Sequence, residues 1–98
     1  MPDYILLMHD DCTREEATGD WNSYLEGLSK VGVLRGGSAI GAGVCFRKQE
    51  PPGPLTSAVN GFVRITARDL DEARELLAGN PVYEAGGTVE IRLLPETD

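Results

Sequence analysis

Positive charge is scarce in this chain. Nine lysines and arginines stand against sixteen aspartates and glutamates, which gives a formal net charge of −7. An acidic domain repels phosphate backbones, so we expect no binding to nucleic acid. The acidic residues are spread along the chain and form no acidic tail, which favours solubility as the role of the charge.

Long apolar runs and paired cysteines are also absent. No stretch approaches the roughly 20 apolar residues that span a bilayer, and the N-terminus shows no secretory signal pattern. The two cysteines, Cys12 and Cys45, form neither a CxxC pair nor a disulfide framework. We therefore expect a cytoplasmic protein with reduced thiols and no membrane partner.

The length of 98 residues suits one domain with a modest core. We expect a single domain over residues 1–98, with residues 95–98 as a tail. A chain this short buries a limited share of its surface, so oligomerisation is expected on size alone.

The spacing of apolar residues predicts seven elements. Strands are predicted over residues 4–8, 33–40, 44–48, 61–67 and 88–94, and helices over residues 14–31 and between Asp69 and Gly79. Capping boxes, Thr13 with Glu16 and Asp69 with Glu72, are expected to start the helices. The glycine-rich stretch 36–43 lacks a phosphate-binding motif and is predicted to belong to a hairpin, with Gly41-Ala42-Gly43 as the tight turn between the strands over 33–40 and 44–48. Residues 49–60 are predicted to be a proline-rich loop, and residues 82–86 a connector.

This order of elements predicts an α+β fold with the ferredoxin-like split βαβ arrangement. It combines an antiparallel sheet, two helices on one face and an added hairpin strand. From alternation we expect the uncovered face to carry Tyr4, Leu6, Met8, Phe62, Arg64, Glu90 and Arg92. So much apolar surface in a soluble protein usually meets a partner, so the chain is predicted to form a homodimer through this open face and to enclose a cleft.

Several segments, taken in order, resemble the YCII-related (DGPF-domain) family. They are a tyrosine-led first strand of the form xYxLLx ending in Asp, GVLRGG after the first helix, DLDEARELL, and a GGTVEIRLL finish. The resemblance covers residues 3–94. It implies a dimeric α/β barrel, and it implies little about activity, because many members have no established one.

The chain departs from this family at two places. Where the DGPF signature would fall, the sequence reads PPGPLTSAVNGF. YCII-type relatives also carry a histidine–aspartate pair with the histidine on the first helix, and by count from Gly32 that histidine falls at or beside Trp21. No histidine occurs in residues 14–31, so the pair cannot be carried over. Trp21 itself is predicted to belong to the core, with a pocket mouth as the alternative.

The only histidine lies in a polar cluster at the end of the first predicted strand: His9, Asp10, Asp11 and Cys12. One interpretation is a proton-transfer group formed by His9 with Asp10 or Asp11. The other is a strand end whose aspartates favour a turn before Thr13. The cluster lacks a standard ligand spacing, so we expect no metal.

Arginines from three predicted strands form a second candidate site. Arg35, Arg64 and Arg92 could bind a carboxylate or phosphate, or could instead pair with Glu90 or with the other subunit. Tyr83 in the predicted connector could reach a cleft.

Two functional hypotheses from different classes follow. The first is a small homodimeric protein that binds a small anionic molecule in the cleft of the dimer. The second is a non-catalytic dimerisation or regulatory module whose cleft is filled by side chains. Heme-linked or monooxygenase-like chemistry is a weaker idea that rests on fold analogy, and a single histidine beside two acids is a poor axial ligand, so we expect no cofactor.

Overall fold

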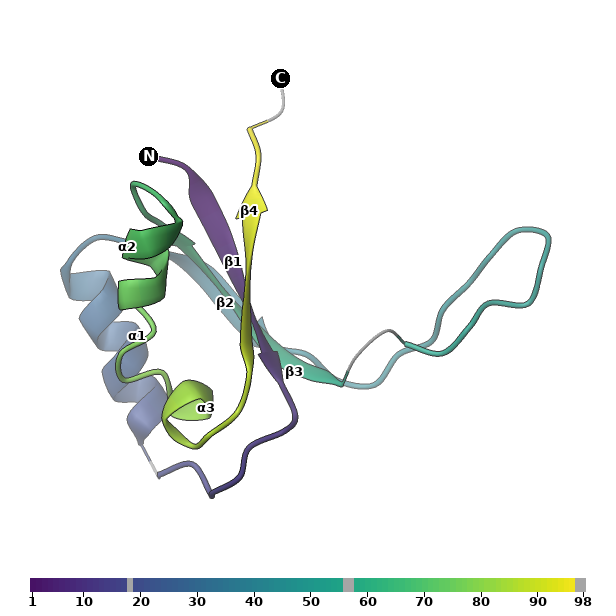
Figure 1. Ribbon diagram of the computed structural model, residues 1–98, viewed down its shortest axis with the longest axis horizontal. Helices are drawn as coiled ribbons and strands as arrows, with labels where there is room; N and C mark the ends of the chain where they lie inside the picture. The colour runs from purple at the N-terminus through teal and green to yellow at the C-terminus, as the bar shows by residue number, and fades with distance from the viewer. Residues whose placement is uncertain (18, 56–57, 97–98) are drawn as a thin grey trace.

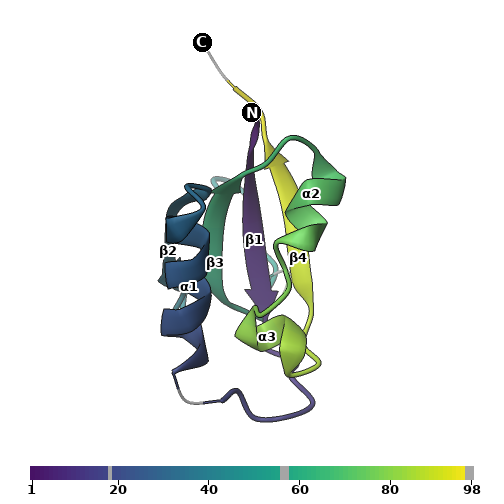
Figure 2. The same cartoon turned by 90° about the vertical axis from the view of Figure 1, so that its left-hand side faces the viewer.

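The computed structural model describes residues 1–17, 19–55 and 58–96 of the chain. Its elements are β1 (Asp3–His9), α1 (Asp20–Lys30), β2 (Leu34–Ala39), β3 (Val59–Thr66), α2 (Leu70–Glu75), α3 (Pro81–Glu84) and β4 (Val89–Leu94). The strands form one antiparallel sheet in the order β2-β3-β1-β4. The helices lie on one face of the sheet (Figures 1 and 2). This is the ferredoxin-like α+β arrangement that the sequence predicts.

The strand register decides which face each side chain occupies. Leu6 lies opposite Val63 on β3 and Ile91 on β4, and all three point toward the helices. The prediction that Tyr4, Leu6 and Met8 lie on the open face is therefore wrong. Both alternating sets of β1 are apolar, so the pattern alone could not separate them. Ile5 and Leu7 occupy the open face instead.

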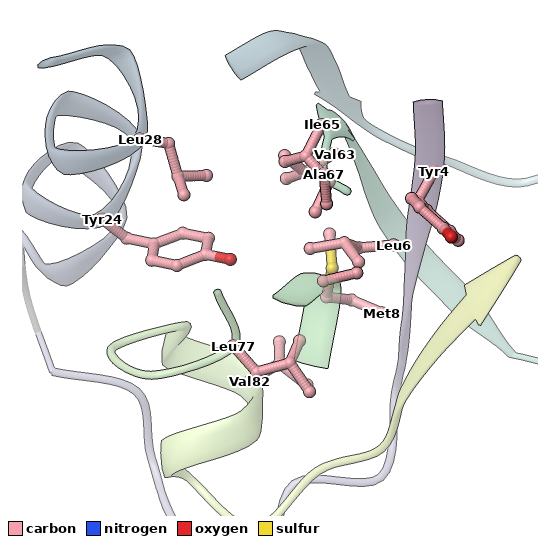
Figure 3. Close-up of a cluster of buried hydrophobic side chains, with 11 residues drawn as sticks. Tyr4, Leu6, Met8, Tyr24, Leu28, Val63, Ile65, Ala67, Leu77 and Val82 are labelled. Carbon is pink, nitrogen blue, oxygen red and sulfur yellow. The ribbon is translucent and has the colours of Figure 1, made fainter. Parts of the chain in front are cut away.

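The core lies between the sheet and the helices (Figure 3). Leu6 and Ile65 are fully buried at its centre, and Tyr24 and Leu28 of α1 cover them. Burial of each large aliphatic side chain contributes about 1.5–3 kcal/mol. The Tyr24 hydroxyl donates to the Leu76 carbonyl at 2.8 Å, so its polar end is satisfied inside the core.

Helix α1 begins later than the sequence predicts. It starts at Asp20, after Gly19 in a left-handed conformation with φ of 85°. Thr13 makes no capping box. Its backbone N–H and its hydroxyl both donate to the Ala85 carbonyl, at 2.9 and 3.3 Å. A carbonyl 72 residues away therefore satisfies the donors of Thr13, and residues 13–17 form neither helix nor strand.

The second predicted cap is confirmed. The Asp69 side chain accepts from the Glu72 N–H at 2.9 Å and starts α2. The helix ends at Glu75, and the predicted connector contains the short helix α3. Buried Asn80 caps α3 by accepting from the N–H groups of Val82 and Tyr83. Pro81 follows at the first helical position, where its missing N–H costs nothing.

No strand forms over residues 44–48, so the predicted added hairpin strand is wrong. Residues 40–55, here called the arm, have neither helix nor strand and project away from the sheet (Figure 1). Three prolines in the returning branch remove backbone donors, so a hydrogen-bonded ladder cannot close. Within the part of the chain that the structure describes, no helix is long and apolar enough to cross a membrane.

Candidate functional site

A cavity of about 560 Å³ lies between the first half of α1 and strands β2 and β3. We call it the α1 cavity. Its walls are largely apolar and include Met8, Trp21, Leu25, Leu34, Val63 and Val82. The predicted core residue Trp21 is thus only partly buried: it packs against the core and also lines the cavity. The volume falls within the range of about 300–1,000 Å³ that is usual for small-molecule sites.

Small residues on the helix-facing side of the sheet create this space. Gly37 lies opposite Val63, and Ala39 lies opposite Gly61, which in turn lies opposite Met8. A Cβ atom at Gly37 would come within 2.7 Å of the Phe62 carbonyl oxygen, so the close approach of β2 and β3 requires glycine there. Gly36 and Gly37, which lie in the strand predicted over residues 33–40, therefore belong to β2 and leave part of its surface bare, whereas the predicted turn glycines Gly41 and Gly43 lie outside the strand.

Among the described residues that line the cavity, the only charged side chain is the carboxylate of Glu16. The Trp21 indole N–H donates to Glu16 Oε1 at 2.5 Å, and both residues line the cavity. Ser38 and Asn60 add neutral polar atoms. Among the described residues that line it there is no lysine, arginine or histidine. The cavity is therefore suited to a neutral or cationic molecule and disfavours an anion.

A row of ionic side chains lies on the open face of the sheet. His9 Nε2 lies 3.0 Å from Glu90 Oε1, and Arg92 Nη1 lies 3.2 Å from Glu90 Oε2. The hydrogen bond with His9, and secondarily the one with Arg92, lowers the pKa of Glu90 below its ordinary value. The carboxylate beside His9 is thus Glu90, which lies 81 residues away in sequence.

The two predicted aspartate partners of His9 lie elsewhere. Asp11 accepts from the N–H and the hydroxyl of Thr88, at 2.7 and 2.6 Å. These bonds, the hydroxyl first, lower the pKa of the Asp11 carboxyl. Asp10 is exposed. Asp11 therefore anchors the turn after β1, which matches the strand-end interpretation, and within the described residues no metal-binding cluster forms.

Cys12 follows this turn and is half-buried. Its Sγ lies 3.9 Å from the Val82 carbonyl oxygen. Burial raises the pKa of the Cys12 thiol, with Glu16 adding to the effect. A raised pKa keeps the thiol protonated, so this cysteine is poorly suited to nucleophilic chemistry.

The structure brings two of the three candidate arginines together. Arg64 and Arg92 both lie opposite Ile5, on the two strands that flank β1. Arg64 pairs with Asp3 at 3.7 Å, and Arg92 pairs with Glu90. Arg35 is displaced by a register shift between Leu34 and Gly36, and its guanidinium donates to the carbonyls of Gly32 and Leu34.

Tyr83 does not belong to this group. It lies on α3, on the helix side of the sheet, and is about half exposed. The sequence did carry a signal for the features it missed. Glycine and alanine at successive inward positions of β2 indicate a hollow. Glu90 was already predicted to share a face with Arg92, and only its pairing with His9 was missed.

Comparison with known proteins supports the resemblance seen in the sequence. The profile of the YCII-related domain matches residues 3–97, nearly the whole chain. No curated protein matches the chain at a significant level.

Proposed function

The chain belongs to the YCII-related family, and from that premise we propose that it is a homodimeric small-molecule-binding protein. In this proposal two copies pair through their open sheet faces, and each copy holds a neutral, largely apolar molecule in its α1 cavity. The observation that carries the proposal is the 560 Å³ cavity with apolar walls and a single carboxylate–indole pair.

The chemistry of the cavity favours binding over proton transfer. Relatives carry a histidine at or beside the position of Trp21. An indole N–H donates a hydrogen bond but does not exchange its proton at neutral pH, so it cannot serve as a general acid or base. Its partner Glu16 accepts that bond, and a ligand with an N–H or O–H group could take the place of the indole there. A non-catalytic dimerisation module would need no such cavity.

The proposal that the open faces pair is supported by the side chains that they carry and by the accessible surface area of the chain. Ile5, Leu7 and Phe62 form a half-buried apolar strip across β1 and β3, with charged side chains around it. The surface of the single chain measures 6931 Å², against about 5,500 Å² for a compact monomer of this mass. The excess of about 1,400 Å² belongs to the whole chain, its projecting residues 40–55 included, and is more than the roughly 800 Å² that each partner of a standard interface buries.

The only tryptophan of the chain provides the test, because it lines the cavity. The neutral dye N-phenyl-1-naphthylamine should bind saturably and quench the fluorescence of Trp21 by energy transfer. Gly61→Leu places a large side chain beside Met8 and should weaken this binding at least tenfold.

Asn22→Leu adds the same apolar bulk on the exposed side of α1 and should leave the affinity unchanged. Circular dichroism checks that both variants fold. Equal dye affinity in the two variants would contradict the cavity as the binding site.

A second candidate function rests on Arg64 and Arg92, which flank Ile5 on the open face. In a homodimer these arginines would be enclosed at the interface, where a small carboxylate or phosphate could bind between them. His9, held by Glu90, would then be the proton-transfer group.

Isothermal titration with inorganic phosphate and with succinate tests this second site. Arg64→Gln and Arg92→Gln should each weaken anion binding, while Gly61→Leu should not affect it. If His9→Ala retains full affinity and any activity found, His9 has no role in the site.

A further inference from the structure

We propose that the arm, residues 40–55, is a clasp that closes over the second copy of the chain when the two open faces meet. This inference rests on the proposed pairing of the open faces. It adds an interface element that the sheet face does not contain, and it assigns a role to Phe46 and Val44, the most exposed large apolar side chains among the described residues.

The arm concentrates apolar side chains that its own chain leaves in water. Phe46 is 90% exposed, Val44 71% and Leu55 52%. Isolated exposed apolar residues are normal, but three large ones within twelve residues of one projection form a contact surface. A solvated linker of this length would be expected to carry polar residues instead.

The arm also lies where a second copy would sit. It leaves the sheet between β2 and β3 and extends on the side opposite the helices (Figure 1). The radius of gyration is 14.8 Å, compared with about 13 Å for a compact domain of this length, so the arm adds to the extent of the chain without adding to its core. A copy docked on the open face must therefore pass beside the arm, and two-fold symmetry makes the contact reciprocal.

Charge complementarity identifies the same occupant. The arm carries Arg47 and Lys48 and one acid, Glu50, for a net charge of +1. The rest of the chain then has seven basic and fifteen acidic residues, a net charge of −8. The arm and the rest of the chain thus carry net charges of opposite sign, which favours contact of an arm with the body of a second copy over pairing between two arms.

The arm is partly pre-organised for such a contact. Its two branches approach each other where the Cys45 Sγ lies 3.7 Å from the Pro54 carbonyl oxygen. Arg47 pairs with Glu50 at 3.3 Å near the tip. Prolines 51, 52 and 54 restrict the returning branch, so docking costs less conformational entropy than ordering a flexible loop would.

Sedimentation equilibrium of the full chain tests the clasp. Phe46→Ser should raise the dimer dissociation constant about tenfold or more. Val31→Ser is the matched control, since Val31 is 67% exposed on the helix side, and it should leave the constant unchanged. Leu7→Arg, on the open face, should abolish the dimer and so tests the pairing itself.

The outcomes separate the two proposals. A wild-type chain that sediments as a monomer overturns both the pairing and the clasp. A dimer that Leu7→Arg breaks and Phe46→Ser leaves intact overturns the clasp alone. Isotope-filtered nuclear Overhauser effects in a mixed-label dimer give a direct readout: contacts from the Phe46 ring to the other subunit are expected, and contacts confined to its own subunit would rule the clasp out.

Discussion

His9 and Glu90 meet across the β1–β4 pair, with 3.0 Å between Nε2 and Oε1. Arg92 approaches the other carboxylate oxygen of Glu90, so one acid links two donors on the open face. The three side chains lie at the surface, where an ion pair contributes little to stability. Their arrangement therefore bears on what the open face can bind rather than on how the chain folds.

We predict that the pKa of Glu90 lies below 4.5 in the folded protein and rises when its donors are removed. His9→Ala should raise it most, because the His9 hydrogen bond is the largest cause of the shift. Arg92→Ala should raise it less. Carboxyl-detected NMR titration of Glu90 measures all three values, and an unchanged pKa in His9→Ala would show that the pair does not form in solution.

We predict that Asp11 stabilises the fold only while it is ionised. Its pKa is lowered in the folded state, so its contribution is complete above the ordinary value of about 3.8 and declines as the pH falls through the lowered value. Asp11→Asn should therefore melt below wild type at pH 7, and the difference should shrink below pH 4. Paired calorimetric scans at pH 7 and pH 3 measure it. Asp10→Asn, at an exposed neighbour, should melt like wild type at pH 7.

Local patterns predicted most of the fold because they coincide with the tertiary structure. The alternation in residues 61–67 and the Asp69 cap both appear as expected. Thr13 fits a capping pattern equally well, but the Ala85 carbonyl competes for its donors, and no local pattern encodes that contact. The face of β1 was ambiguous for a related reason, since both of its alternating sets are apolar.

The candidate site was harder to predict than the fold, because it depends on which strands pair and in which register. Glu90 becomes the partner of His9 only because β1 and β4 are neighbours in the sheet. The cavity depends on the register that sets Gly37, Ala39 and Gly61 on one face, and the alternating small residues of β2 do not by themselves say that this face points toward the helices. The sequence could thus name several chemical groups but could not place them together.

The helix-facing core should be far more sensitive to truncation than the outer end of β4. Leu6 is fully buried between Val63 and Ile91, so Leu6→Ala should lower the free energy of unfolding by about 2–5 kcal/mol. Leu93→Ala removes the same atoms from a side chain that is 54% exposed and should cost less than about 1 kcal/mol. Urea denaturation gives both values. Similar costs at the two positions would contradict the burial of Leu6 beneath the helices.

The close approach of β2 and β3 at Gly37 leads to a prediction about the stability of β2, the strand beside the cavity. A Cβ atom there would meet the Phe62 carbonyl oxygen at 2.7 Å, and that oxygen belongs to the neighbouring strand, so relief requires the strands to separate. Gly37→Ala should cost about 1–3 kcal/mol and should speed amide hydrogen exchange along β2. Gly41→Ala meets no atom within 4 Å and has no positive φ, so it should be neutral or stabilise by up to about 1 kcal/mol. Equal stability of the two variants would mean that β2 can move away from β3 at no cost, and the cavity wall would then not be fixed.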